Sequence, residues 1–161
     1  MSKVPSRGFS RDEFAARLAA VQSQMASQRM GALLLTTESD IFYFTGFLSQ
    51  FWQSPTRPWF VVIPAAGLPI AVIPEIGVNA MKSEFMTDIR SWASPHATDD
   101  GVSLLAETVL EVLAQSQSCT LGLNKGRETQ IRMPMNDFES LMDRLRGSVA
   151  DLCVLDATPA V

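Results

Sequence analysis

The sequence contains few of the residues that usually carry catalysis or metal binding. Its 161 residues include one histidine, His96, and two cysteines, Cys119 and Cys153. Common zinc sites use two or three histidine or cysteine ligands, so a complete metalloenzyme is disfavoured. A Ser-His-Asp set needs one histidine and stays open. Two cysteines in apolar surroundings indicate reduced core residues rather than a disulfide framework.

Long apolar runs and basic runs are also missing. The longest apolar stretch, residues 59–74, is interrupted by Pro64, Gly67 and Pro69, whereas a membrane span needs about 20 consecutive apolar residues. The N-terminus lacks the apolar segment of a signal peptide. A net charge of −4 without a basic cluster disfavours binding to nucleic acid or anionic lipid. We therefore expect a cytoplasmic protein with neither a nucleic-acid nor a membrane partner.

The remaining sequence predicts one α/β domain. Apolar residues make up 47% of the chain, enough for a sizeable core. Short apolar runs bounded by turn residues predict six strands, at 32–37, 57–63, 69–73, 88–92, 120–124 and 151–156. Helical spacing predicts helices at 11–30, 39–46, 75–85, about 101–115 and 134–145. This alternation, with one hairpin at 57–73, predicts a three-layer domain in which helices flank a mixed sheet of about six strands.

Local signals set the expected helix boundaries. Residues 10–13, Ser-Arg-Asp-Glu, form a capping box that starts the first helix, and Gly31 is a suitable residue to follow its end. Ser39 or Asp40 is expected to cap the second helix, which Gly46 ends. Residues 1–9 before the first helix are expected to form a flexible arm.

The candidate catalytic and cation-binding residues each have a simpler structural explanation. His96, in a polar loop, is either a catalytic base or an exposed loop histidine, and we favour the loop histidine. The pairs Asp12-Glu13 and Asp99-Asp100 could bind a cation, but both precede or begin predicted helices. Carboxylates there satisfy free amides, so capping is the better account.

Two further groups have the same ambiguity. The segment 122–128, Gly-Leu-Asn-Lys-Gly-Arg-Glu, has glycines and basic residues but matches no phosphate-binding motif, which favours a simple connection to the next helix. Several methionines suit gap-filling in a core or interface better than metal binding. These methionines are Met81, Met86, Met133 and Met135.

The segment 47–59 is the strongest candidate for recognition. It places Phe51, Trp52 and Arg57 in or beside a loop broken by proline. Rigid rings supply contact area and a guanidinium pairs with carboxylates, which is typical of a recognition patch. The alternative is a loop folded back over a sheet edge, and the sequence favours neither.

Several motifs, taken in order, resemble the N-terminal domain of the creatinase/prolidase/aminopeptidase P family. The sharpest is residues 39–47, Ser-Asp-Ile-Phe-Tyr-Phe-Thr-Gly-Phe, which is similar to the family's N-I-x-Y-L-T-G-F stretch. It follows a first helix containing Phe14 to Leu18 and the run Gly31 to Leu35. The hairpin, the Leu121-Gly122-Leu123 segment and the closing Val154 to Pro159 follow in the family's order.

The resemblance implies a ribonuclease H-like α/β domain over 10–156, with 157–161 starting a linker to an absent C-terminal pita-bread domain. In peptidase members that second domain holds two divalent metal ions (Mn, Co or Zn), so no metal, cofactor or catalytic residue is expected in this chain. The N-terminal domain would mediate homodimer contacts and gate the partner's active site. Arg57, with Phe51 or Trp52, would bind substrate in trans.

These expectations lead to three hypotheses. The first is a non-catalytic domain of a creatinase/prolidase-type hydrolase, proline dipeptidase- or aminopeptidase P-like, that cleaves a C–N bond. The second is a stand-alone small-molecule or protein-binding α/β module in which the aromatic loop is the whole site. The third, a free-standing hydrolase using His96, is the least favoured.

Overall fold

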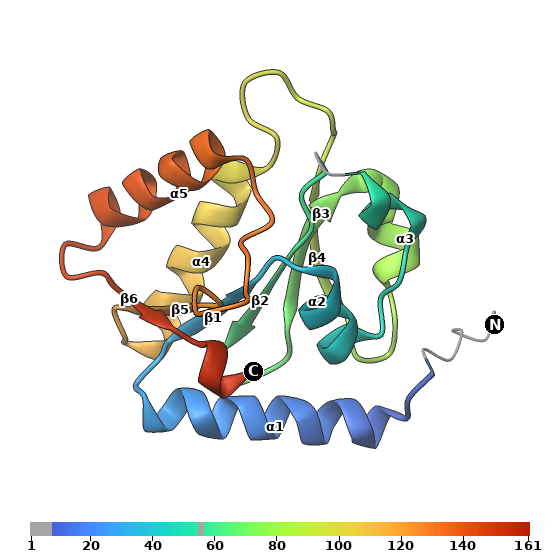
Figure 1. Cartoon of the computed structure of the whole chain (residues 1–161), viewed down its shortest axis with the longest axis horizontal. Helices are drawn as coiled ribbons and strands as arrows, with labels where there is room; N and C mark the ends of the chain where they lie inside the picture. The colour runs from blue at the N-terminus through green and yellow to red at the C-terminus, as the bar shows by residue number, and fades with distance from the viewer. Residues whose placement is uncertain (1–7, 55–56) are drawn as a thin grey trace.

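The computed structural model describes residues 8–54 and 57–161, and its elements follow the predicted order (Figure 1). The helices are α1 (Arg11–Ser27), α2 (Glu38–Thr45), α3 (Val78–Met81), α4 (Val102–Ser116) and α5 (Met135–Ser148). The strands are β1 (Ala32–Leu35), β2 (Phe60–Pro64), β3 (Ile70–Pro74), β4 (Asp88–Trp92), β5 (Thr120–Leu123) and β6 (Cys153–Asp156). Short 3-10 helices are η1 (Gln50–Gln53), η2 (Glu75–Gly77) and η3 (Thr158–Ala160).

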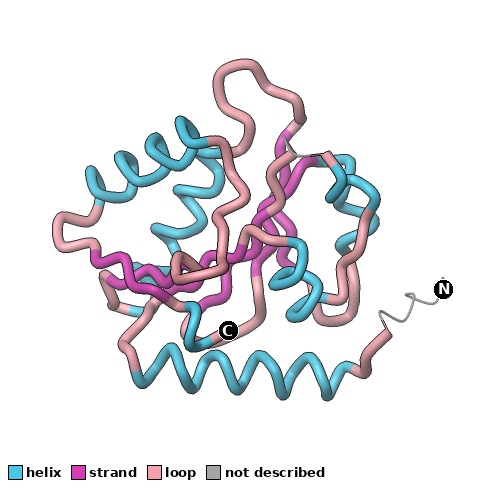
Figure 2. The backbone as a smooth tube through the Cα atoms, viewed as in Figure 1, coloured by secondary structure: helices cyan, strands magenta, loops and turns pink. Residues whose placement is uncertain are grey.

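The six strands form one mixed sheet in the order β4-β3-β2-β1-β5-β6. Strand β2 is antiparallel to both of its neighbours, and every other neighbouring pair is parallel. Strand β2 therefore runs against the other five, and the predicted hairpin and mixed sheet are confirmed. The carboxyl ends of β1, β3 and β5 lie at the same edge of the sheet as the amino end of β2. Loops gather at these strand ends (Figure 2).

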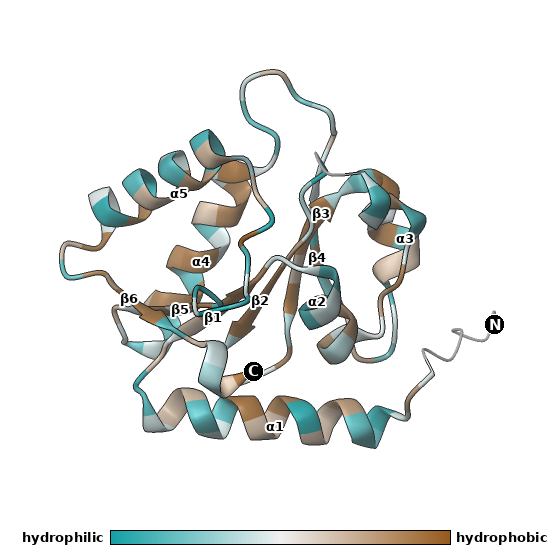
Figure 3. Ribbon diagram, in the orientation of Figure 1, coloured by the Kyte–Doolittle hydropathy of each residue, from teal (hydrophilic) through white to brown (hydrophobic). Residues whose placement is uncertain are grey.

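Helices cover both faces of the sheet, as predicted. Side chains alternate along β1, so Leu33 and Leu35 pack into the core beneath α1 and α2. Ala32 and Leu34 pack into the second core, beneath α4 and α5. Helix α4 is the more hydrophobic of that pair (Figure 3). Seven of its residues are buried. The three-layer class is confirmed.

The predicted cap of α1 is confirmed, but its end is not. The Glu13 amide donates to Ser10 Oγ at 3.2 Å. The helix ends at Ser27 rather than residue 30, because Arg29 turns the chain with a positive φ of 57°. Gly31 serves close packing instead, since a Cβ there would collide with the side chain of Ser116.

Two other helix starts and the length of one helix differ from the prediction. Thr37, rather than Ser39 or Asp40, caps α2, because its hydroxyl lies where the Asp40 amide points. Gly46 ends that helix in the left-handed conformation, as predicted. The predicted helix at 75–85 is shorter and consists of η2 followed by α3. Gly101 occupies the N-cap position of α4, where Asp99 or Asp100 was expected, but the Asp99 carboxylate still accepts a hydrogen bond from the Ser103 amide in the first turn.

The two cysteines and one methionine are more exposed than predicted. Cys119 and Cys153 are both exposed and both free. Cys153 begins β6, which is an edge strand, so one side of it has no neighbouring strand to cover it. Met135, in the first turn of α5, is 71% exposed, whereas Met81 and Met86 fill the core.

Residues directly outside the predicted domain 10–156 make contacts with it. Phe9, in the expected arm, lies 5.9 Å from the Phe14 ring and stacks on the guanidinium of Arg17. Ala157, in the expected linker, is fully buried, and η3 follows it. The rest of the arm, residues 1–7, lies outside the described residues. No helix in the described ranges is long and apolar enough to cross a membrane.

Candidate functional site

The aromatic segment after α2 folds back onto the edge of the sheet. Trp52, in η1, is only 7% exposed, and its ring centroid lies 6.0 Å from Trp59 and 6.3 Å from Phe47. Trp59 and Phe47 are fully buried in the core beneath α1 and α2. Trp52 is therefore an anchor of the segment, and its ring is largely withdrawn from solvent.

Phe51 and Arg57 lie on the outer side of this anchor. Phe51 is half-buried and stacks on Trp59, with ring centroids 6.0 Å apart. The guanidinium of Arg57 lies 5.5 Å from the centroid of the Phe51 ring. Within the described ranges Arg57 forms no ion pair with a carboxylate. The structure thus brings together two of the three predicted site residues, at the strand end where β1 finishes and β2 begins.

A residue that the sequence analysis missed holds this segment in place. Arg132, in the connection between β5 and α5, donates from its guanidinium to the backbone carbonyls of Trp52, Ser54 and Arg57. Its Cζ atom lies 4.9 Å from the centroid of the Trp52 ring. Burial lowers the pKa of Arg132, and the charge of Glu38 opposes that shift. Arginine stays protonated at neutral pH, so the contact is a charged one.

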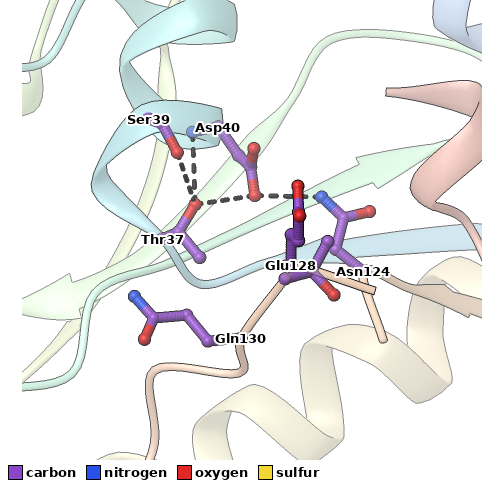
Figure 4. Close-up of a pocket in the computed structure, with 7 residues that line it drawn as sticks. Thr37, Ser39, Asp40, Asn124, Glu128 and Gln130 are labelled. Carbon is purple, nitrogen blue, oxygen red and sulfur yellow. Dashed lines mark hydrogen bonds between the residues drawn. The ribbon is translucent and has the colours of Figure 1, made fainter. Parts of the chain in front are cut away.

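A polar pocket lies at the carboxyl ends of β1 and β5 (Figure 4). It encloses about 270 Å³. The Asp40 carboxylate accepts hydrogen bonds from Thr37 Oγ1 at 2.7 Å and from Asn124 Nδ2 at 3.0 Å. These bonds tie the start of α2 to the end of β5. The other lining residues are Ser39, Glu128, Thr129 and Gln130.

His96 and the aspartates near it maintain their own loop. His96 Nδ1 accepts a hydrogen bond from the Asp99 amide at 3.2 Å. Asp100 accepts from Trp92 Nε1 at 2.7 Å, and Asp99 accepts from the Ser103 amide at 3.1 Å. Burial raises the pKa of Asp99, but hydrogen bonds from Ser103 and Val102 outweigh it and the pKa falls. These contacts agree with the loop and capping interpretations.

The segment 122–128 leads from the end of β5 into the connection to α5 and forms no open phosphate cradle. The Lys125 amide donates to Asp156 Oδ1 at 3.4 Å, and the Gly126 amide donates to Thr158 Oγ1 at 3.0 Å. Hydrogen bonds from Thr158 also lower the pKa of Asp156. Both amides therefore already donate hydrogen bonds to side chains at the end of β6 and in η3.

The described residues also offer no group of three or more histidine, cysteine, aspartate or glutamate side chains that could hold a metal ion. The pair of divalent ions that the resemblance places in a further domain has no fitting ligand set among them.

Comparison with known proteins identifies the family. The family model described as the Creatinase/Prolidase N-terminal domain matches residues 17–159. The chain belongs to the creatinase/prolidase N-terminal domain family. The match covers nearly the whole chain and includes the aromatic segment, Arg132 and the polar pocket. No curated protein sequence matches the chain significantly.

Solved structures of this domain share its fold at low identity. A dipeptidase PepE from Mycobacterium ulcerans is 23% identical, with a TM-score of 0.65, over 94% of this chain and 36% of its own. A prolidase from Thermococcus sibiricus is 17% identical, with a TM-score of 0.66, over 91% and 35%. A Creatinase/Prolidase N-terminal domain of an X-Pro dipeptidase from Streptococcus pyogenes is 15% identical, with a TM-score of 0.60, over 89% and 95%.

The creatinase/prolidase N-terminal domain therefore spans about a third of the first two proteins and nearly all of the third. At these identities the likeness establishes the fold.

Proposed function

We propose that this chain is the non-catalytic N-terminal domain of a creatinase/prolidase-type hydrolase, in which it serves oligomerisation and gates substrate in trans. The hydrolase would cleave a C–N bond in a small substrate, as a proline dipeptidase or aminopeptidase P does. Its partners would be a C-terminal catalytic domain of the same polypeptide and a second copy of the chain. The protein would be cytoplasmic.

The position of Arg57 carries this proposal. The guanidinium lies against the Phe51 ring without a carboxylate partner among the described residues, shortly before β2 begins. A guanidinium offers a planar fork of donors that fits a carboxylate with two hydrogen bonds. Arg57 would therefore pair with the carboxylate of a substrate in a neighbouring active site. Phe51 would help orient it, and Trp52 would act through packing.

Arg57→Ala in the full-length protein tests the substrate role. We expect the KM for Xaa-Pro dipeptides to rise about 10- to 100-fold, because a charged hydrogen bond contributes about 1.5–3 kcal/mol. The kcat should change little, since Arg57 binds substrate without entering the bond-breaking step. Arg146→Ala, at an exposed position in the last turn of α5, is the control. An unchanged KM for Arg57→Ala would reject the role.

Mixed dimers test whether Arg57 acts in trans. The Arg57→Ala chain is combined with a chain inactivated in its catalytic domain. If each Arg57 serves its neighbour's site, mixed dimers contain one intact site and recover activity with a normal KM. No recovery would show that Arg57 acts within its own chain. Peptidase activity from residues 1–161 alone would contradict the non-catalytic assignment.

A further inference from the structure

Arg132 lies where it can control the path of the chain on both sides of residues 55–56. Its backbone amide donates to Thr36 Oγ1 at 3.0 Å, which fixes Arg132 to the carboxyl end of β1. Its guanidinium donates to the Trp52 carbonyl, at 3.3 Å from Nη2, and to the Ser54 carbonyl, both on one side of residues 55–56. Nη1 reaches the Arg57 carbonyl on the other side. Arg132 therefore links the end of β1, through its backbone amide, to both sides of residues 55–56, through its side chain.

The contacts of Arg132 differ from those of Arg17 and Arg90, two other half-buried arginines. Arg17 and Arg90 pair with carboxylates, whereas the guanidinium of Arg132 donates to three backbone carbonyls. Hydrogen bonds to carbonyls fix the main chain rather than one side chain. The fork of a guanidinium has donors that point in different directions, which a single ammonium group does not reproduce in the same geometry.

The Trp52 ring completes the attachment. It lies against the guanidinium on one side and against the buried Trp59 on another. A cation over an aromatic face is attracted by the electrons of the ring, and the attraction is stronger where water is excluded. Trp52 therefore ties Arg132 to the hydrophobic core, so the segment is held by both polar and apolar contacts.

We propose that Arg132 is a positioning residue that sets the location of the Arg57 guanidinium for substrate in the neighbouring site. The inference rests on the proposed function of Arg57. Arg132 does not itself touch substrate. It holds the Arg57 carbonyl, which fixes where the side chain leaves the backbone, and Phe51 then supports the guanidinium. A misplacement of about 1 Å at such a group is enough to weaken a reaction severely.

The test uses Arg132→Ala and Arg132→Lys in the full-length protein, with Arg127→Ala as the matched control. Arg127 lies in the same connection and is exposed. We expect Arg132→Ala to raise the KM for an Xaa-Pro dipeptide about tenfold with little change in kcat. Arg132→Lys should fall between Arg132→Ala and the native protein, and Arg127→Ala should match the native protein.

Two further readouts separate positioning from a general loss of stability. Backbone amides in residues 49–54 and that of Arg57 should exchange hydrogen for deuterium faster in Arg132→Ala, while amides of β1 and β5 keep their native protection. The double variant Arg57→Ala/Arg132→Ala should have the same KM as Arg57→Ala alone, because Arg132 acts only through Arg57. Fully additive effects would overturn the inference.

The outcomes distinguish the two proposals. A raised KM for Arg57→Ala together with a native KM for both Arg132 variants would overturn the positioning role and leave the role of Arg57 standing. An unchanged KM for Arg57→Ala would overturn the proposed function and, with it, the positioning role. If Arg132→Ala does not fold, Arg132→Lys and its double variant with Arg57→Ala carry the same comparison.

Discussion

At the scale of single residues, the carboxylate of Asp99 shows how hydrogen bonds outweigh burial. Burial alone would raise the pKa of this group. The Ser103 hydroxyl and amide both donate to it, and the Val102 amide adds a further bond, so the pKa falls. The ionised form is therefore favoured in the folded state.

Replacing Ser103 with alanine should raise the pKa of Asp99, because the side-chain donor is lost while the amide remains. Carboxyl carbon chemical shifts followed by NMR during a pH titration measure this. Ser148→Ala, at the exposed end of α5, should leave the titration of Asp99 unchanged. An unchanged Asp99 titration in Ser103→Ala would show that the hydroxyl contributes nothing.

The same shift sets the sign of the pH dependence. A folded-state pKa below the unfolded value, about 3.9 for aspartate, adds stability above that pH. This contribution is lost as the pH falls through the folded-state pKa. Urea denaturation between pH 6 and pH 3 should therefore show a smaller loss of stability on acidification for Ser103→Ala than for the native chain.

At the scale of elements, local sequence signals located the start of α1 but not its end. The Ser10 cap was confirmed because the amide that donates to it, that of Glu13, lies only three residues away. The Glu13 carboxylate of the predicted capping box pairs with Arg17 instead. The predicted end of α1 was wrong, because Arg29 adopts the left-handed conformation that was expected at Gly31. Gly31 is reserved for packing against Ser116, and that contact joins residues far apart in the chain.

The cap of α1 gives a quantitative prediction. Ser10→Ala should destabilise the chain by about 1 kcal/mol, the usual effect of losing an N-terminal cap. The midpoint of urea denaturation measures the change. Ser10→Asp keeps an acceptor for the Glu13 amide and should stay near the native midpoint. Equal losses in both variants would show that the hydroxyl bond is not the cause.

The candidate site was only partly accessible from sequence. The aromatic and cationic residues of 47–59 are neighbours in the chain, so their composition marked the segment. Arg132 lies in a segment predicted to be a polar connection. No residue near it in the sequence indicates which carbonyls it binds. The burial of Trp52 likewise depends on Trp59 and the sheet edge, which only the folded chain brings together.

At the scale of the whole molecule, the sheet separates two cores that share its central strands. Leu33 is fully buried beneath α1 and α2. Leu33→Ala should reduce the free energy of unfolding by about 2–5 kcal/mol, because it removes buried methyl groups and leaves a cavity. Urea denaturation followed by circular dichroism measures it.

Leu68→Ala is the matched control for this prediction. Leu68, in the turn between β2 and β3, is 44% exposed, so its replacement should change stability by less than about 1 kcal/mol. Losses of equal size at both positions would contradict the assignment of Leu33 to the core.

The overall architecture was predictable because apolar runs, turns and helical spacing agree along the chain. The exposure of Cys153 was not predictable from the sequence, because the order of strands in the sheet decides which strands lie at an edge. Cys153 begins β6, and its sequence resembles that of a covered strand. The position of a strand at the edge or in the centre of a sheet depends on pairing between distant segments. A local sequence pattern carries no information about that pairing.

The placement of β1 between β2 and β5 also bears on how the chain is synthesised. Ala32 pairs with Pro64 on one side and with Leu121 on the other. The ribosome therefore releases one partner of β1 long before the other. Until β5 emerges, a nascent chain that has already paired β1 with β2 exposes the backbone groups of its most hydrophobic strand. Protection of this transient edge by a chaperone would matter most during that interval.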